Sequence, residues 1–193
     1  MTIMQPELFY IADPMCSWCY GFAPVMEKVI ENFGDDMKIN PVVGGLRVEG
    51  AHLLSPELKE TLVHHWHEVE KQSGQPFNYD FDVPENFVYN TEPSCRAVVT
   101  MRRLKPESAF PYFDALHRAF YAENKDVTDT AVLRDEAEKF GLAPADFDEW
   151  FTHTETCKET YDDFAFSQGM GITGFPSIVL KDERGLALLT AGY

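Results

Sequence analysis

A Cys-x-x-Cys pair lies between a short apolar strand and a long helix, and this arrangement restricts the possible folds more than any other stretch of the chain. Residues 8–12 form an apolar run that favours a β-strand. The proline after Asp13 disfavours helical backbone at Asp13, so we expect the strand to end there. Apolar residues then recur at helical spacing over 17–33. Cys16 and Cys19 therefore lie at the start of this helix.

This position gives the two thiols different chemistry. Unpaired backbone N–H groups and the positive end of the helix dipole favour the thiolate form of Cys16. The dipole supplies only about 0.3–1 kcal/mol, so hydrogen bonds from Cys19 or nearby N–H groups have to supply any larger effect. We expect an exposed Cys16 and a more buried Cys19. Thiol–disulfide exchange needs this asymmetry, because one thiolate attacks a substrate disulfide and the second thiol resolves the mixed disulfide.

A Cys-x-x-Cys pair alone is also compatible with half of a zinc site, a structural disulfide or chance. A four-cysteine zinc site would need Cys95 and Cys157, which do not form a second closely spaced pair. His64 and His67 share a helix face with charged residues, which is typical of a solvated surface. We therefore predict no metal site.

Two further features accompany the cysteine pair. Pro24 lies inside the helical pattern, where a proline costs about 3 kcal/mol unless a kink is needed. Residues 171–177, which contain Phe175 and Pro176, lead into another apolar run. Both features resemble the thioredoxin superfamily, whose active-site helix has a kinking proline at this offset and whose cis-proline loop faces the cysteines. The resemblance implies that Phe175 and Pro176 bind an extended substrate and that Pro176 is cis.

Four motifs spread over most of the chain carry a closer resemblance. They are Asp13–Cys19, Val43–Leu46, Asn90–Pro93 and Thr173–Pro176. With these motifs the chain resembles the DsbA-like branch of the superfamily, in particular the predicted disulfide isomerases and frenolicin-biosynthesis-like proteins. The resemblance implies an α/β fold, that is, a thioredoxin-like domain with an all-helical insertion.

The order of predicted elements fits this fold. A second strand at about 37–43 completes a βαβ unit, helical patterns follow almost throughout, and a hairpin at 177–191 ends the sequence. We predict a thioredoxin-like domain from residues 1–48 and 169–193, and a helical insertion over 49–168. A thioredoxin-like sheet normally has one more helix after its last strand, so we expect this helix to be missing from the sequence or supplied from elsewhere.

The net charge of the chain limits the classes of partner that it can bind. The chain has 16 Lys and Arg residues against 32 Asp and Glu residues, a net charge of −16, which opposes binding to nucleic acids and to anionic membranes. No stretch approaches the roughly 20 apolar residues of a membrane span, and the N-terminus does not resemble a signal peptide. We expect a cytoplasmic protein, in which the cysteine pair rests mostly reduced and acts as a reductase or isomerase rather than an oxidase.

Several residues are candidates for auxiliary roles. Trp18 either packs or forms an apolar rim for a substrate polypeptide, and it brings no positive charge of the kind that makes a strong oxidant. Asp13 is a candidate helix cap or a neighbour of the thiols. Cys95 begins a later helix, where the dipole could again favour a thiolate. The resemblance implies that this helix start faces the active-site cleft, so Cys95 and Asn90 are candidates for redox or substrate contact. Cys157 lies on an apolar helix face and is expected to be inert.

The predicted function is thiol–disulfide exchange on protein or peptide substrates, with Cys16 as nucleophile and Cys19 as the resolving thiol. It requires no cofactor beyond a thiol reductant system, although glutathione could be a co-substrate. Kappa-type glutathione transferases and 2-hydroxychromene-2-carboxylate isomerases share the inserted fold and are the alternative, but they present a serine in place of Cys16. A chaperone-like binder that uses the cleft between the domains is a third hypothesis. The oligomeric state is not predicted.

Overall fold

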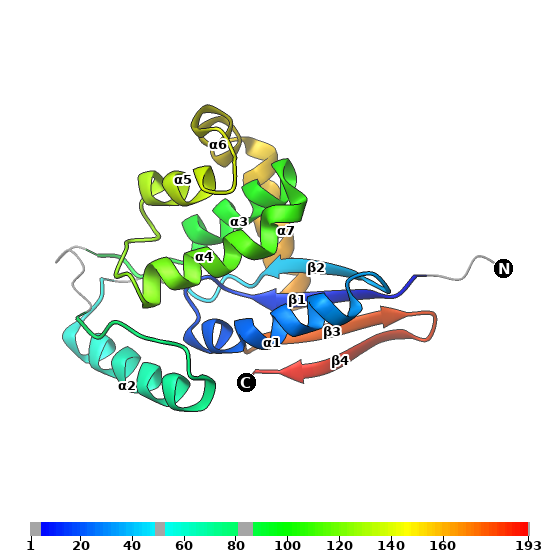
Figure 1. The fold of residues 1–193 in the computed structure, drawn as a ribbon, viewed down its shortest axis with the longest axis horizontal. Helices are drawn as coiled ribbons and strands as arrows, with labels where there is room; N and C mark the ends of the chain where they lie inside the picture. The colour runs from blue at the N-terminus through cyan, green and yellow to red at the C-terminus, as the bar shows by residue number, and fades with distance from the viewer. Residues whose placement is uncertain (1–4, 49–52, 81–86, 193) are drawn as a thin grey trace.

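The two ends of the chain meet in one mixed β-sheet. The computed structural model describes residues 5–48, 53–80 and 87–192. In these residues the sheet has the strand order β2-β1-β3-β4 (Figure 1). β1 pairs in parallel with β2, whereas β3 is antiparallel to both β1 and β4. The strands are β1 (Glu7–Ala12), β2 (Lys38–Val43), β3 (Ser177–Asp182) and β4 (Gly185–Ala191).

Helices fill most of the sequence between the strands. Within the described residues they are α1 (Ser17–Phe33), α2 (Pro56–Ser73), α3 (Glu92–Leu104), the short 3-10 helix η1 (Pro106–Ser108), α4 (Ala109–Tyr121), α5 (Thr130–Glu138), α6 (Pro144–Phe151) and α7 (Thr154–Gly169). All but α1 lie between β2 and β3 in the sequence, so the predicted thioredoxin-like fold with a helical insertion is confirmed.

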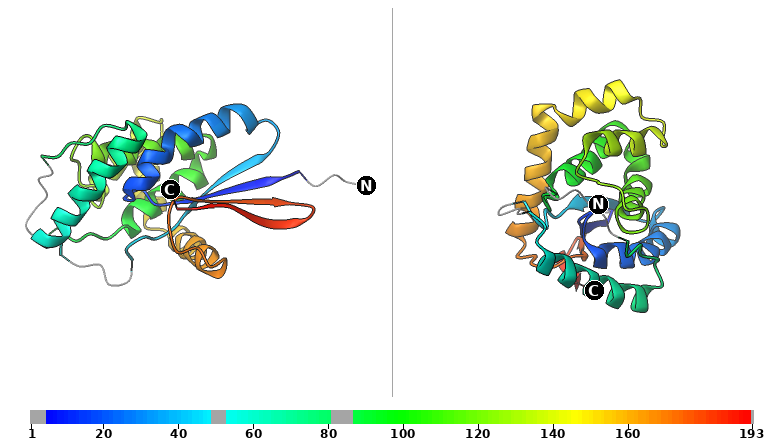
Figure 2. Two further views of the ribbon diagram at one scale, coloured as in Figure 1. Left: turned by 90° about the horizontal axis from the view of Figure 1, so that it is seen from below. Right: turned by 90° about the vertical axis from the view of Figure 1, so that its left-hand side faces the viewer.

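The central strand β1 is buried on both faces, which explains why its sequence is apolar from Leu8 to Ala12. Tyr10 points to the α1 side, where its ring lies 6.3 Å from that of Phe22. Phe9 points to the opposite side, where its ring lies 5.3 Å from that of Phe166 on α7. Figure 2 shows α1 and α7 on opposite faces of the sheet. The sheet is therefore a middle layer between two helices.

The first helix of the insertion, α2, has a residue typical of a helix cap at each end. The Ser55 side chain accepts a hydrogen bond from the Leu58 backbone N–H at 3.2 Å, and Gly74 ends α2 with a left-handed φ of 74°. Trp66 and Val69 form the buried stripe of α2. In the described segment directly after α2, Phe77 is buried and Tyr79 is half-buried against the core.

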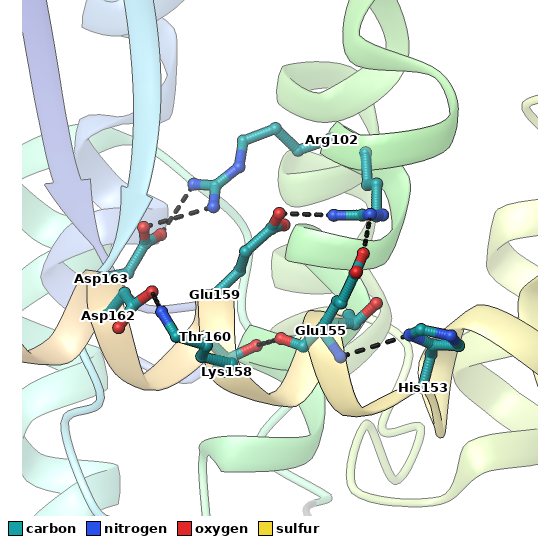
Figure 3. Close-up of polar contacts among 10 residues, drawn as sticks. Arg102, His153, Glu155, Lys158, Glu159, Thr160, Asp162 and Asp163 are labelled. Carbon is teal, nitrogen blue, oxygen red and sulfur yellow. Dashed lines mark hydrogen bonds and ion pairs between the residues drawn. The ribbon is translucent and has the colours of Figure 1, made fainter.

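An ion-pair network joins the insertion to the sheet. Arg102 of α3 donates two hydrogen bonds to the Asp163 carboxylate of α7, at 2.7 and 3.2 Å (Figure 3). Arg102 also donates to the Pro41 carbonyl at 2.8 Å, and Asp163 accepts the Val43 backbone N–H at 3.0 Å. The end of β2 is thus held by side chains of two helices. This matters for the site because the next residues, from Gly44 onward, run past the cysteines.

Two structural facts bear on the remaining fold predictions. The predicted boundary at residue 49 lies outside the described residues, and α7 packs both on α3 and on β2. The division into a thioredoxin-like domain and an insertion with those limits stays a prediction.

None of the helices in the described ranges is long and apolar enough to cross a membrane.

Gly21 lets α1 and α2 approach closely. A Cβ atom added at Gly21 would lie 2.6 Å from Val69 Cγ1, whereas one added at Gly169 of α7 would have nothing within 4 Å. Overpacking costs about 1–3 kcal/mol, while replacing a helical glycine by alanine gains up to about 1 kcal/mol. We predict that Gly21→Ala lowers the free energy of unfolding in urea and that the matched Gly169→Ala leaves it unchanged or higher. A Gly21→Ala protein as stable as the wild type would contradict this account of the interface.

Candidate active site

Cys16 is the N-cap residue of α1, and Cys19 lies one turn inside the helix. The Cys16 backbone N–H donates to the Asp13 carbonyl at 3.0 Å, and the Cys16 carbonyl accepts the first helical hydrogen bond from Tyr20 at 3.1 Å. Cys16 is 6% exposed and Cys19 is fully buried. The predicted order of burial is therefore confirmed, but the prediction of an exposed Cys16 is wrong. The Phe175 carbonyl, distant in sequence, lies 3.7 Å from the Cys16 sulfur.

The loop before β3 faces the cysteine pair. The peptide bond between Phe175 and Pro176 is cis. The Phe175 carbonyl accepts a hydrogen bond from Cys16 Sγ over 3.7 Å. Gly44 makes room for this loop, because a Cβ atom there would lie 2.3 Å from the Phe175 ring. The motifs at 43–46 and 173–176 thus lie against each other beside Cys16.

Asp13 has a fully buried carboxylate that joins three separate segments. Its Oδ1 accepts the Met15 backbone N–H at 2.9 Å. Its Oδ2 accepts the Leu46 backbone N–H at 2.7 Å, the Thr91 hydroxyl at 2.8 Å and the Cys95 thiol at 3.3 Å. Asp13 does not cap α1, one of the two roles that we considered for it. It fastens the cysteine turn, the loop after β2 and the start of α3 to one another.

The same burial determines the protonation of this cluster. Burial raises the pKa of Asp13 above its usual value, and the hydrogen bonds from Leu46, Met15, Thr91 and Cys95 counteract part of that rise. Burial, together with the charge of Asp13, raises the pKa of the Cys95 thiol well above its usual range. The hypothesis that the helix start favours a Cys95 thiolate is therefore wrong. Cys95 is a protonated hydrogen-bond donor.

Cys19 is also held as a thiol. Burial raises its pKa well above the usual value, and the hydrogen bond to Cys16 adds to the rise. A protonated Cys19 beneath the Cys16 sulfur can donate a hydrogen bond to it. The pair thus has one sulfur that faces the cis-proline loop and one that is a buried donor.

Two further residues of this site were missed by sequence reasoning. The Tyr89 hydroxyl donates to the Met15 carbonyl at 2.6 Å. His117 Nε2 lies 3.2 Å from the Asp13 carbonyl and must be the donor, because a carbonyl only accepts. Neither residue has a local motif, and both are far from the cysteines in sequence. Aromatic residues in a helical insertion predict only a core.

The other candidates lie as follows. The Asn90 side chain accepts the Glu92 backbone N–H at 3.1 Å and so contributes to the start of α3. Trp18 is half-buried and packs on the core. The exposed His67 ring stacks on Tyr79, with centroids 4.1 Å apart. No group of three or more metal-binding side chains occurs in the described residues, which are 5–48, 53–80 and 87–192. Cys157 is half-buried and accepts a hydrogen bond from the Arg96 guanidinium at 3.4 Å.

His117 makes stability depend on pH. Burial lowers its pKa to about 4, so between about pH 6.5 and 4 the unfolded chain binds a proton that the folded protein does not. The stability that a neutral His117 provides is present above this range and is lost as pH falls through it, by about 3 kcal/mol in all. We predict that His117→Gln removes this part of the difference in unfolding free energy between pH 7 and pH 4.5. Exposed His65→Gln controls for loss of a histidine, and equal pH dependence of wild type and His117→Gln would exclude this role.

Solved structures share the fold at several levels of identity. A "putative protein disulfide isomerase" from Nitrosomonas europaea is 39% identical with a TM-score of 0.92, and the match covers 98% of this chain and 91% of that one. The cytosolic disulfide reductase DsbM from Pseudomonas aeruginosa is 23% identical with a TM-score of 0.80, over 95% and 89% of the two chains, and it has also been solved with GSH. A 2-hydroxychromene-2-carboxylate isomerase shares the fold at 15% identity and a TM-score of 0.67, over 89% and 84%.

A curated relative and a family model complete the comparison. The ClpXP adapter protein SpxH of Halalkalibacterium halodurans is 22% identical in an alignment over 189 residues, and the match covers 93% of this chain. The chain spans about three fifths of the length of that relative, since the match covers 61% of it. The model of the DSBA-like thioredoxin domain matches residues 8–191. Because this match spans nearly the whole chain, the protein belongs to the DSBA-like thioredoxin family.

Proposed function

We propose that this oxidoreductase catalyses thiol–disulfide exchange on protein or peptide substrates through Cys16 and Cys19. The observation that carries the proposal is the position of Cys16, at a helix N-terminus, above a buried Cys19 thiol and 3.7 Å from the Phe175 carbonyl. Membership of the DSBA-like family supports an oxidoreductase of this kind.

The proposed reaction exchanges two thiols for one disulfide. The Cys16 thiolate attacks a substrate disulfide, forms a mixed disulfide and releases the first substrate thiolate, which takes up a proton. Cys19 then loses its proton and attacks the Cys16 sulfur, so that the second substrate sulfur leaves as a thiol. The substrate gains two electrons and two protons, and the enzyme retains a Cys16–Cys19 disulfide. A thiol reductant must reduce this disulfide before the next cycle.

The substrate is proposed to lie along the cis-proline loop. Phe175 and Pro176 would bind its extended backbone beside Cys16, and the half-buried Trp18 would contribute an apolar rim. Asp13 is a positioning residue, because its carboxylate holds the turn that carries Cys16 and the loop that contacts Phe175. Cys95 and Asn90 support that position from the start of α3.

The proposed direction is reduction or isomerisation. No cation occurs between the two cysteines, so the strong thiolate stabilisation of an oxidase is not built into the motif. A cytoplasmic location would keep the pair reduced, and the DsbM reductase, described as cytosolic, shares the fold. The glutathione-bound form of DsbM supports glutathione as a co-substrate or reductant.

A glutathione-dependent isomerase or transferase is the second candidate. The fold shared with a 2-hydroxychromene-2-carboxylate isomerase favours it. The two functions differ in their need for Cys19, because conversion of a glutathione adduct requires no resolving thiol. Turnover of such a substrate that survived loss of Cys19 would therefore favour this candidate. Protein holding that survived loss of both cysteines would favour a chaperone-like binder.

Trapping of the mixed disulfide tests the proposal. We predict that Cys16→Ser abolishes reduction of a peptide disulfide, because no attacking sulfur remains. Cys19→Ser is expected to accumulate a covalent adduct of enzyme and peptide, which mass spectrometry detects and a reductant removes.

Cys157→Ser is the matched control, since this cysteine lies on α7 and contacts Arg96 rather than the cysteine pair. It should retain the wild-type rate and form no stable adduct. The proposal would be wrong if Cys19→Ser formed no adduct through Cys16 or if Cys16→Ser retained activity.

A further inference from the structure

A groove lies between α1 and α4, away from the cis-proline loop. It has a volume of about 560 Å³, within the range of about 300–1,000 Å³ that is usual for small-molecule sites. Its walls are mainly apolar and include Met26, Ile30, Phe110, Phe113 and Phe140. Its volume and lining suit a ligand with an aromatic or aliphatic body.

Two buried polar side chains form part of the groove lining. Tyr10 is 3% exposed and His117 is 1% exposed, and both belong to the lining. Neither the Tyr10 hydroxyl nor His117 Nδ1 has a hydrogen-bond partner among the residues that the structure describes. Both atoms have less than 1 Å² of accessible surface, so they lie beneath the floor of the groove and a ligand does not reach them.

The rim of the groove is acidic. Its described lining contains one cation, Arg118, and four acidic residues, which are Glu27 and Glu31 of α1, Glu107 of η1 and Asp114 of α4. Arg118 and Asp114 lie 3.7 Å apart as an ion pair, which leaves three glutamates to set the potential. This potential attracts cations and repels carboxylates.

We propose that the groove binds a small molecule with an apolar aromatic body and a cationic hydrogen-bond donor, of the aromatic amine class. The apolar walls receive the body, and the glutamates at the rim favour the ammonium group. The site does not include either cysteine of the proposed exchange reaction. The proposal of this ligand site therefore does not depend on the proposed exchange reaction.

The test compares two probes of opposite charge. Phenethylamine and 3-phenylpropionate have similar bodies, and their binding is followed by titration calorimetry and by backbone amide shifts in NMR spectra. We expect phenethylamine to shift signals of α1 and α4 and to bind at least about tenfold more tightly than 3-phenylpropionate. The double variant Glu27→Gln, Glu31→Gln, at two exposed positions, is expected to reduce this preference.

Variants on one helix locate the site. Ala23 lines the groove, so Ala23→Trp should fill it and abolish binding, whereas Val25, which is 43% exposed and outside the lining, should tolerate Val25→Trp. Circular dichroism checks that both variants fold, and the glutamine double variant gives an independent answer if Ala23→Trp does not. The proposal is overturned if neither probe binds, if both bind equally, if Ala23→Trp binds as the wild type does, or if only a basic amphipathic peptide occupies the groove.

Discussion

The buried carboxylate of Asp13 is the interaction on which the active site depends. It accepts hydrogen bonds from Met15 in the cysteine turn, from Leu46 after β2, and from Thr91 and Cys95 at the start of α3. Loss of one such bond leaves a buried polar group unsatisfied, at a cost of about 1–3 kcal/mol. The thioredoxin-like part and the helical insertion are thus joined directly beside the cysteines.

The backbone of Asp13 extends this arrangement. Its carbonyl accepts both the Cys16 N–H, at 3.0 Å, and a hydrogen bond from His117, at 3.2 Å. One residue therefore links the nucleophile, through the backbone, to the floor of the groove between α1 and α4. Cys19 remains a protonated donor beneath Cys16 because burial raises its pKa. The chemistry of the pair follows from this packing as much as from the Cys-x-x-Cys spacing.

Local patterns predicted the fold well because their causes are local. The strand that ends before the cysteines and the helix that begins with them follow from adjacent residues. The partners of Asp13 could not be predicted in this way, since Thr91 and Cys95 reach it only through the tertiary fold. For the same reason the sequence did not show that Cys16 would be buried or that Cys95 would donate to a carboxylate.

The most direct test of this account is the redox equilibrium of the Cys16–Cys19 pair in glutathione buffers of known ratio. The account predicts a reversible two-electron transition, in which both thiols convert together into one intramolecular disulfide. The midpoint potential would then separate a reductase from an isomerase. If the pair did not cycle, or if Cys16 instead accumulated as a stable glutathione adduct while Cys19 stayed a free thiol, the account of exchange chemistry would be contradicted.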